Sequence, residues 1–539
     1  MKHLAGYFVM GITLWMLPGC EDIDLLAHVD DLDTESAGDT NDLQGSDSTG
    51  VDGDTETVQS DPQPRIDGWQ WRICEAMPLT GFENVEPGMN PNPAVTPPMQ
   101  LAGTDQFVTM YTESELDFLF YTSVNTFPSS QTPTNYNLYS SQGDSVRALP
   151  LRNGGMAYVR RSLAWEELGF ETKLAISDLQ PGGTPIEIPL PGQDLGRLPS
   201  LLALDGIVIV FSELNGEFTF GAETTKATTL NTGDAGVSNY MAAYTVQGEL
   251  IKAQLIDLPF IIGDVELDTV SNTVIAAGMM SHSSGDRSIG VVRLSPASIV
   301  IPEVGEIEKV WASYNVLNSD NASFADVWGL DVVPDKTGGF FIFSRTPVPE
   351  PVGIFDGISK VGEASGSDIF FQIMTHYTAE NQNDWLFFYD DDDKNTTTSW
   401  DVTWLRPSGT VYAEGLLFLA GTASKAFLEK MRDAGTPVEN NLESFSPVMV
   451  ALVYGNDGQP PHFNVVRRMP AQLDIQGLSV TDAALEADGM SDVVLSALYK
   501  KDIEFPSPVL TPEGETMTLA PTNEEVVLLK VCDIELVIE

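Results

Sequence analysis

The feature that most restricts the fold of this 539-residue chain is a short pattern that recurs along it: a polar turn followed by a run of residues that favour β-strands. Clear copies span residues 153–159, 205–211 and 337–343. Looser copies start near Gly103, Asn272, Ser408 and Gly489. Self-similarity at intervals of roughly 50 to 80 residues indicates an architecture that repeats one small β-unit.

Seven such starts resemble the repeats of β-propellers, in which one four-stranded blade often occupies roughly 40 to 50 residues. The resemblance is to propellers in general, because the chain has no WD series, kelch motif or Asp-box series. The expected fold is therefore all-β, a single β-propeller of seven blades. Six or eight blades are alternatives, and tandem β-sandwiches are the structural rival. A short helix is expected at 424–434, between two strands.

The two ends of the expected domain favour closure into a ring. Near its start, Trp69, Trp71 and Ile73 alternate with polar residues, as in a half-buried strand. Near its end, the apolar run 526–532 is typical of a buried strand. If these strands pair within one blade, the propeller is closed.

The first twenty residues are typical of an export segment. The apolar run 4–17 has about 14 residues, too few for an ordinary membrane-spanning helix. It ends in Leu17-Pro18-Gly19-Cys20, which resembles the lipobox of bacterial lipoproteins. Leu17, Gly19 and Cys20 match that pattern, whereas Pro18 stands where Ala, Ser or Thr is usual. The resemblance implies cleavage before Cys20 and lipidation of Cys20; an ordinary secretory signal is the alternative.

A strongly acidic segment follows the cysteine. Between residues 21 and 65 the chain has 14 acidic residues, and Arg65 is the only Lys or Arg. Such a composition buries too little apolar surface to offset the entropy of ordering, and its charges repel one another. The expected organisation is a signal peptide at 1–19, an acidic disordered tether at 20–65 and a propeller-like domain at 66–539.

The three cysteines of the chain lie at boundaries of this organisation. If Cys20 carries the lipid, Cys74 and Cys532 are the pair that remains in an oxidising compartment, and a disulfide between them is expected. It would join the first and last strands and lock the ring. Two buried free thiols are the alternative.

The sequence matches no common catalytic template. It has no Gly-x-Ser-x-Gly elbow, no phosphate-binding loop, no His-Glu-x-x-His and no Cys-x-x-Cys. His282, His376 and His462 are far apart, so a shared zinc site is not expected. Four adjacent carboxylates indicate either a solvated loop or a calcium site, and no other cofactor is expected. They are Asp390, Asp391, Asp392 and Asp393.

The net charge of −51, from 78 acidic and 27 basic residues, argues against nucleic acid as a partner. The leading hypothesis is a lipoprotein held by Cys20 to the bacterial cell envelope, preferably at the outer membrane or cell surface. Its propeller would bind a protein or glycan or act as a scaffold, without catalysis. One alternative is an extracytoplasmic polysaccharide hydrolase or lyase, which convergent carboxylates and arginines at the ring centre would favour. Another is an envelope-protein assembly factor.

Overall fold

The computed structural model describes the chain between residues 69 and 536, with gaps in connecting segments. The gaps of five or more residues are 80–93, 113–118, 127–133, 179–183, 193–197, 282–286, 314–327, 347–351, 365–370, 390–404, 430–444, 454–461, 482–490 and 500–524. Cys20, the acidic segment up to residue 65 and Asp390–Asp393 therefore lie outside the described residues, and the expectations for them stay predictions. No helix in the described part is long and apolar enough to span a bilayer.

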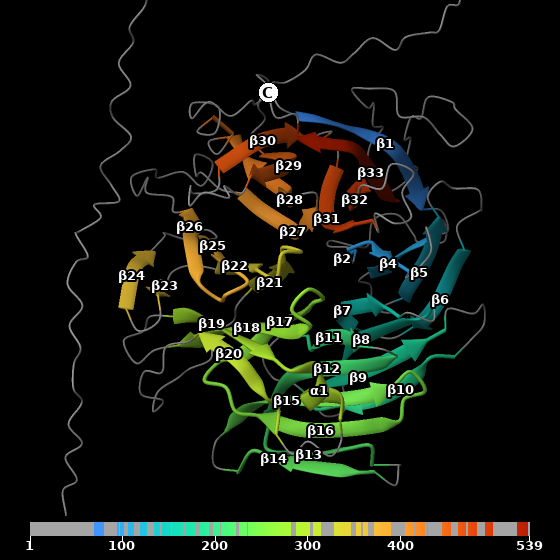
Figure 1. The fold of residues 1–539 in the computed structure, drawn as a ribbon. Coiled ribbons are helices and arrows are strands. Elements are labelled where there is room, and N and C mark those ends of the chain that lie inside the picture. Colours follow the sequence, from blue (N-terminus) through green and yellow to red (C-terminus); the bar gives the residue numbers. More distant parts are fainter. Residues whose placement is uncertain are drawn as a thin grey trace, which may run out of the picture. The chain divides into compact units, whose positions relative to one another are not determined.

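Seven antiparallel sheets follow one another along the described chain, and each is called a blade here (Figure 1). Blade 1 contains β2 (Ala94–Val95), β3 (Met99–Gln100), β4 (Gln106–Thr112), β5 (Leu119–Thr126) and β6 (Thr134–Ser140). Blade 2 contains β7 (Gly143–Pro150), β8 (Met156–Ala164), β9 (Gly169–Ser177) and β10 (Ile186–Leu190). Blade 3 contains β11 (Ser200–Leu204), β12 (Ile207–Asn215), β15 (Val237–Thr245) and β16 (Leu250–Ile256).

The remaining blades repeat the same arrangement. Blade 4 contains β17 (Ile261–Asp268), β18 (Thr273–Ser281), β19 (Arg287–Leu294) and β20 (Lys309–Ser313). Blade 5 contains β21 (Trp328–Pro334), β22 (Phe340–Thr346), β25 (Phe371–Tyr377) and β26 (Asn383–Tyr389). Blade 6 contains β27 (Leu405–Ala413), β28 (Leu416–Ser424), β29 (Phe445–Val453) and β30 (His462–Arg468). Blade 7 contains β31 (Leu473–Val480), β32 (Val493–Tyr499), β33 (Glu525–Leu536) and the first strand of the domain, β1 (Trp69–Leu79).

The first strands of the blades form the inner ring. Each contacts the next: β7 contacts β11, and the series continues through β17, β21, β27 and β31. The series returns to its start because β31 contacts β2 and β3, and β3 contacts β7. In Figure 1 these strands surround the centre while the later strands of each blade lie further out. The fold is a closed seven-bladed β-propeller, which confirms the predicted class.

The hydrophobic core lies between neighbouring blades. One cluster joins blades 2 and 3, another joins blades 3 and 4, a third joins blades 4 and 5, and a fourth joins blades 6 and 7. The second strands are the most buried, as in the segment from Val208 to Phe211 of β12. Because both faces of these strands are covered, their sequences are continuous apolar runs, which are the second part of the repeated sequence pattern.

The repeated sequence pattern is the turn between the first and second strands of a blade. Gly154, Gly206 and Gly338 lie in these turns with φ between 81° and 96°, a backbone conformation that glycine adopts without steric cost. The expected start at Ser408 is wrong, because Ser408 lies inside β27. A register shift between Pro407 and Gly409 marks an irregularity in the strand there, and Pro and Gly within a strand often mark such bulges.

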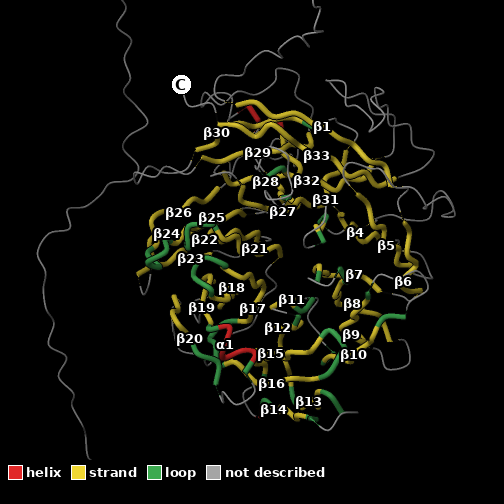
Figure 2. Tube along the Cα trace, turned by 45° about the vertical axis from the view of Figure 1, so that its right-hand side comes forward, coloured by secondary structure: helices red, strands yellow, loops and turns green. Residues whose placement is uncertain are grey.

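Two hairpins are inserted into this plan. The first, β13 (Glu217–Phe220) with β14 (Thr228–Asn231), follows β12. The second, β23 (Val352–Asp356) with β24 (Ser359–Ala364), comes from blade 5 but pairs with β19 of blade 4 at Arg287. Figure 2 shows how little of the ring is helical. The helix α1 (Pro296–Val300) follows β19, and Lys425, Leu428 and Glu429 are helical within the segment where a short helix was expected.

Candidate functional site at the centre of the ring

An arginine on the inner ring connects three consecutive blades. Arg147 of β7 donates a hydrogen bond to the Ser200 Oγ of β11, with Nη1 and Oγ 2.6 Å apart, and to the Gly263 carbonyl of β17 at 3.3 Å. Its second nitrogen, Nη2, forms an ion pair with Asp264 of β17. A contact from blade 2 to blade 4 passes over the inner strand of blade 3. These groups therefore meet on the inner side of the ring.

Asp264 is buried and has partners on both sides. Besides Arg147, it accepts a hydrogen bond from the backbone N–H of Val332 in blade 5, at 2.9 Å. Burial raises the pKa of Asp264 to about 6, and the neighbouring Asp331 adds to this, while Arg147 and the backbone hydrogen bonds oppose it. The group is thus mainly ionised at neutral pH and is held firmly in place.

Glu266 lies two positions further along β17, and alternation in a strand places it on the same side as Asp264. Its side chain is exposed, in contrast to that of Asp264. The inner strands around Glu266 reduce the solvation of its charged form, and the charge of Asp264 adds to this effect. Together they raise the pKa of Glu266 to about 8, and Arg147 only partly offsets the shift. At neutral pH Glu266 is therefore mostly a neutral carboxylic acid with access to solvent.

This group of residues combines different hydrogen-bonding abilities. We call it the axial cluster: Arg147, Ser200, Asp264, Glu266 and Asp331. A protonated Glu266 donates a hydrogen bond, which an ionised carboxylate cannot do, and it can also transfer a proton to a ligand oxygen. Strongly raised pKa values in carboxyl groups are common at functional sites, although structural ion pairs produce them too. The axial cluster is the best candidate site in the described part of the chain.

Other buried ion pairs of the ring brace its turns. In blade 4, Arg293 Nη1 lies 2.8 Å from Asp268 Oδ2, and Nη2 reaches the Gly338 carbonyl of blade 5 at 2.7 Å. In blade 5, His376 Nε2 lies 2.9 Å from Asp335 Oδ2. All four side chains of these two ion pairs are almost fully buried. They connect strands and blades rather than facing a ligand.

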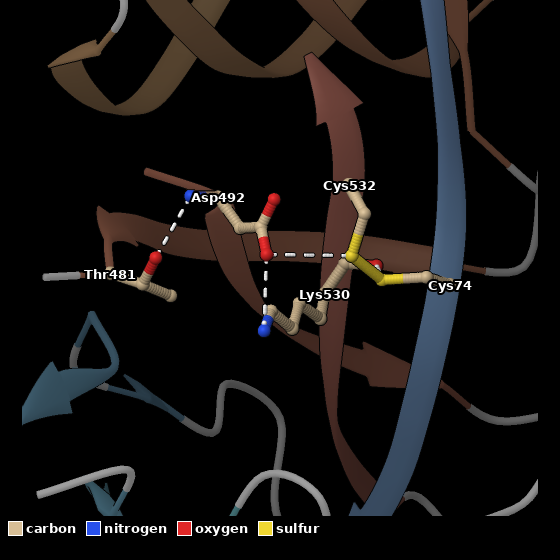
Figure 3. Close-up of a disulfide and its surroundings, with 5 residues drawn as sticks. All are labelled: Cys74, Thr481, Asp492, Lys530 and Cys532. Carbon is tan, nitrogen blue, oxygen red and sulfur yellow. Dashed lines mark hydrogen bonds and ion pairs between the residues drawn. A yellow bond between two sulfur atoms is a disulfide. The ribbon is translucent and has the colours of Figure 1, made fainter. Parts of the chain in front are cut away.

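The expected disulfide between Cys74 and Cys532 is present and joins β1 to β33 in blade 7 (Figure 3). The two Cα atoms are 5.8 Å apart. Asp492 lies beside it, with one carboxylate oxygen 3.5 Å from Cys532 Sγ and 3.0 Å from Lys530 Nζ. Asp492 also exchanges backbone and side-chain hydrogen bonds with Thr481, which ties the end of β31 to the start of β32.

The calcium ligands expected from the sequence are not tested by the structure. Asp390–Asp393 lie outside the described residues, so the calcium alternative stays a prediction. Among the described residues, no group of three or more His, Cys, Asp or Glu side chains is arranged to hold a metal ion. Sequence reasoning did not single out Arg147, Asp264 or Glu266. The available signal was three acidic residues in alternation, 264, 266 and 268, within an otherwise apolar strand.

No family model matches the chain, and no curated protein matches it. Among solved structures, the β-propeller domain of the Trilobed protease from Pyrococcus furiosus matches with 7% identity and a TM-score of 0.36, covering 81% of this chain and 95% of that one. A neuraminidase-like protein of A/flat-faced bat/Peru matches with 8% identity and a TM-score of 0.32, covering 85% and 94%. A GH43_1 enzyme from Xanthomonas citri matches with 11% identity and a TM-score of 0.28, covering 58% and 94%. With TM-scores this low, the fold rests on the strand pairing described above.

Proposed function

We propose that the protein is a lipid-anchored extracytoplasmic lipoprotein of the bacterial envelope whose propeller binds a neutral glycan at the axial cluster. The observation that carries the binding site is the convergence of Arg147, Asp264 and Glu266 from the inner strands of two blades around one exposed carboxyl group. The anchor is supported by the lipobox-like Leu17-Pro18-Gly19-Cys20 and the acidic segment after it.

A neutral glycan suits the chemistry of the cluster. Sugar hydroxyls both donate and accept hydrogen bonds, and the cluster offers the acid Glu266 as a donor and Asp331 as an acceptor. The net charge of −51 repels polyanions over the whole surface, so an acidic polysaccharide is a poorer fit. A binding function requires no further groups.

Binding is tested with the mature chain and a panel of soluble neutral polysaccharides, such as xylan, β-glucan and mannan, by affinity electrophoresis. We expect retardation by at least one polysaccharide and its loss in Glu266→Ala. The matched control is Glu249→Ala, at an exposed turn between β15 and β16. Equal retardation of the wild type and Glu266→Ala would place the binding site elsewhere, and no retardation by any member would oppose the glycan proposal.

The anchor needs a separate test. We expect mass spectrometry of the mature N-terminal peptide to find acyl chains on Cys20, and Cys20→Ser to release the protein from the membrane fraction. More than one acyl chain gives stable membrane attachment, since each buried methylene contributes about 0.8 kcal/mol. An unmodified Cys20 in the mature protein would support the ordinary secretory signal instead.

A second candidate is hydrolysis of a polysaccharide, and the raised pKa of Glu266 specifically favours it. An acid that stays protonated near neutral pH can protonate the leaving oxygen of a glycosidic bond, while a second carboxylate acts as base or nucleophile. Asp331 is the neighbour that would take this second role. Release of reducing ends from the same polysaccharides, abolished in both Glu266→Gln and Asp331→Asn, is the expected result for an enzyme. Binding without release would leave the non-catalytic function.

A further inference from the structure

The strand that links the domain to the N-terminal segment lies at the edge of its sheet. Among the described strands, β1 pairs with β33 alone, antiparallel, from Trp69 opposite Leu536 to Leu79 opposite Val526. The start of β1 and the end of β33 therefore lie at the same end of this ladder. Tension applied at Trp69 would act on the backbone pairs one after another, so hydrogen bonding alone gives an edge strand little resistance to peeling.

The disulfide interrupts this peeling path after the first pairs. Cys74 lies between Ile73, paired with Val531, and Glu75, paired with Lys530, where the register shifts. The extra residue of this irregularity allows Ile73 and Ala76 both to pack on the core of blade 7. Cys74 meanwhile bonds to Cys532, whose neighbour Val531 is buried in that same core (Figure 3).

The crosslink also encloses nearly the whole ring. Its two cysteines are 458 positions apart in sequence, so all of blades 1 to 6 and strands β31 and β32 lie between them. A force that enters along the N-terminal segment reaches β33 through the two sulfur atoms. It does not have to pass through any other blade.

We propose that the Cys74–Cys532 disulfide is a mechanical clasp, which transfers tension from the N-terminal tether to β33 and keeps β1 from peeling off its sheet. Its biological setting rests on the proposed lipid anchor at Cys20, because only an anchored protein that holds a ligand is pulled in this way. The clasp itself belongs to the ring and can be measured without the lipid.

Optical tweezers on residues 21 to 539, the expected mature chain without its lipidated cysteine, test the clasp, with handles joined to terminal peptide tags so that no cysteine is added. In the oxidised protein we expect extension only of the segments outside residues 74–532, with no unfolding steps. After addition of reductant, we expect β1 to detach at low force and the ring to unfold. The added contour length would approach 458 residues at about 3.6 Å each.

The double variant Cys74→Ser/Cys532→Ser should behave like the reduced protein without any reductant. If the variant does not fold, reductant added to a folded wild-type molecule under low tension gives the same comparison. Identical force traces before and after reduction would overturn the clasp. The anchor is tested separately, by the loss of membrane attachment in Cys20→Ser of the full chain. The chain used for the force traces lacks Cys20, so failure of one proposal is distinguishable from failure of the other.

Discussion

Asp264 and Glu266 of β17 are neighbours on one side of the strand but have different surroundings. Asp264 is buried against Arg147 and the backbone of Val332, so its position is fixed by direct partners. Glu266 is exposed, yet the raised pKa of its carboxyl group comes first from reduced solvation among the inner strands and then from the like charge of Asp264. Environments that differ in this way separate the pKa values of two carboxyl groups, which gives one of them the capacity to donate a proton near neutral pH.

The substitution Glu266→Gln should change how stability depends on pH. The pKa of Glu266 is raised from its ordinary value of 4.5 to about 8 in the folded protein. Between pH 4.5 and about pH 8, the folded protein therefore keeps a proton on Glu266 that the unfolded chain has released. Wild-type stability therefore falls as the pH rises through this window, and glutamine removes that loss. We expect the melting temperature of the variant relative to wild type to increase from pH 5 to about pH 8 and to level off above it, measured by differential scanning fluorimetry.

The matched control for this experiment is Glu249→Gln, which alters an exposed glutamate in the turn between β15 and β16. Its melting temperature relative to wild type should stay constant over the same pH range. Parallel curves for Glu266→Gln and wild type would contradict the raised pKa. They would also remove the reason for treating Glu266 as a proton donor.

The sequence alone could not select these residues. With 78 acidic residues in the chain, no pair of carboxylates is distinctive. Arg147 and Asp264 are 117 positions apart in sequence, and all of blade 3 lies between them. Only the closed ring brings them together, so no local sequence pattern marks the pair. The disulfide was within reach of sequence reasoning, since three cysteines leave one pair once Cys20 is set aside.

At the scale of strands and turns, three blades share one device. A buried carboxylate near the turn between the first two strands is paired with a basic residue of the third strand. The pairs are Asp268 with Arg293, Asp335 with His376, and Asp492 with Lys530. Although burial alone would raise the pKa of Asp335, hydrogen bonds from His376 and Thr337 outweigh it and hold the pKa below its ordinary value. These pairs fix the turns where the repeated pattern begins.

Arg293 should be the most sensitive member of this set. Its guanidinium bonds Asp268, Ser271 and Thr273 in blade 4 and the Gly338 carbonyl in blade 5, and it lies 4.8 Å from the centre of the Phe340 ring. Removing one partner of a buried pair leaves an unpaired charge, so Arg293→Ala should lower the free energy of unfolding by roughly 3–5 kcal/mol.

Arg293→Lys separates charge from geometry in this brace. Lysine keeps the charge but cannot bond two blades with a planar fork, so an intermediate loss is expected in urea-induced unfolding. Equal stability of Arg293→Ala and wild type would mean that the contact between blades 4 and 5 does not depend on this brace.

A pair of glycines in blade 4 should tolerate no side chain. Gly278 and Gly290 face each other across β18 and β19, and the Phe260 ring lies against both. A Cβ at Gly290 would overlap the Phe260 ring, so Gly290→Ala should destabilise the protein by roughly 1–3 kcal/mol through overpacking. Gly263→Ala is the milder comparison in urea-induced unfolding, because its nearest neighbour is the mobile end of Leu330 at 3.2 Å. A larger loss for Gly263→Ala would contradict this explanation.

The repeat was visible in the sequence where a turn glycine precedes a run of buried residues in the second strand, 208–211 after Gly206 and 340–343 after Gly338. The predicted repeat start at Ser408 was wrong, because Pro407 and Gly409 at a strand irregularity have the local composition of a turn. The inserted hairpins β13–β14 and β23–β24 left no repeat signal. The pairing of β23 with another blade is tertiary and has no local sequence mark.

At the scale of the whole molecule, closure depends on pairing the two ends of the domain. The residues near Trp69 and those from 526 to 532 were predicted to be strands, and they are paired in blade 7 as β1 and β33. Such closure removes most exposed sheet edges but leaves one noncovalent joint between sequence-distant strands. The disulfide spans this joint.

Loss of that crosslink should therefore lower stability without changing the fold. In the chain-entropy account, a disulfide that closes so long a loop contributes roughly 5 kcal/mol by restricting the unfolded chain. We expect Cys74→Ser/Cys532→Ser to retain the wild-type far-ultraviolet circular dichroism spectrum but to unfold at lower urea concentration, matching the reduced wild type. Because the constraint acts on the unfolded chain, the variant should also show a larger dependence of unfolding free energy on urea. If oxidised and variant proteins unfold at the same urea concentration, the packing of Ala76 and Ile73 on the core of blade 7 closes the ring without covalent help.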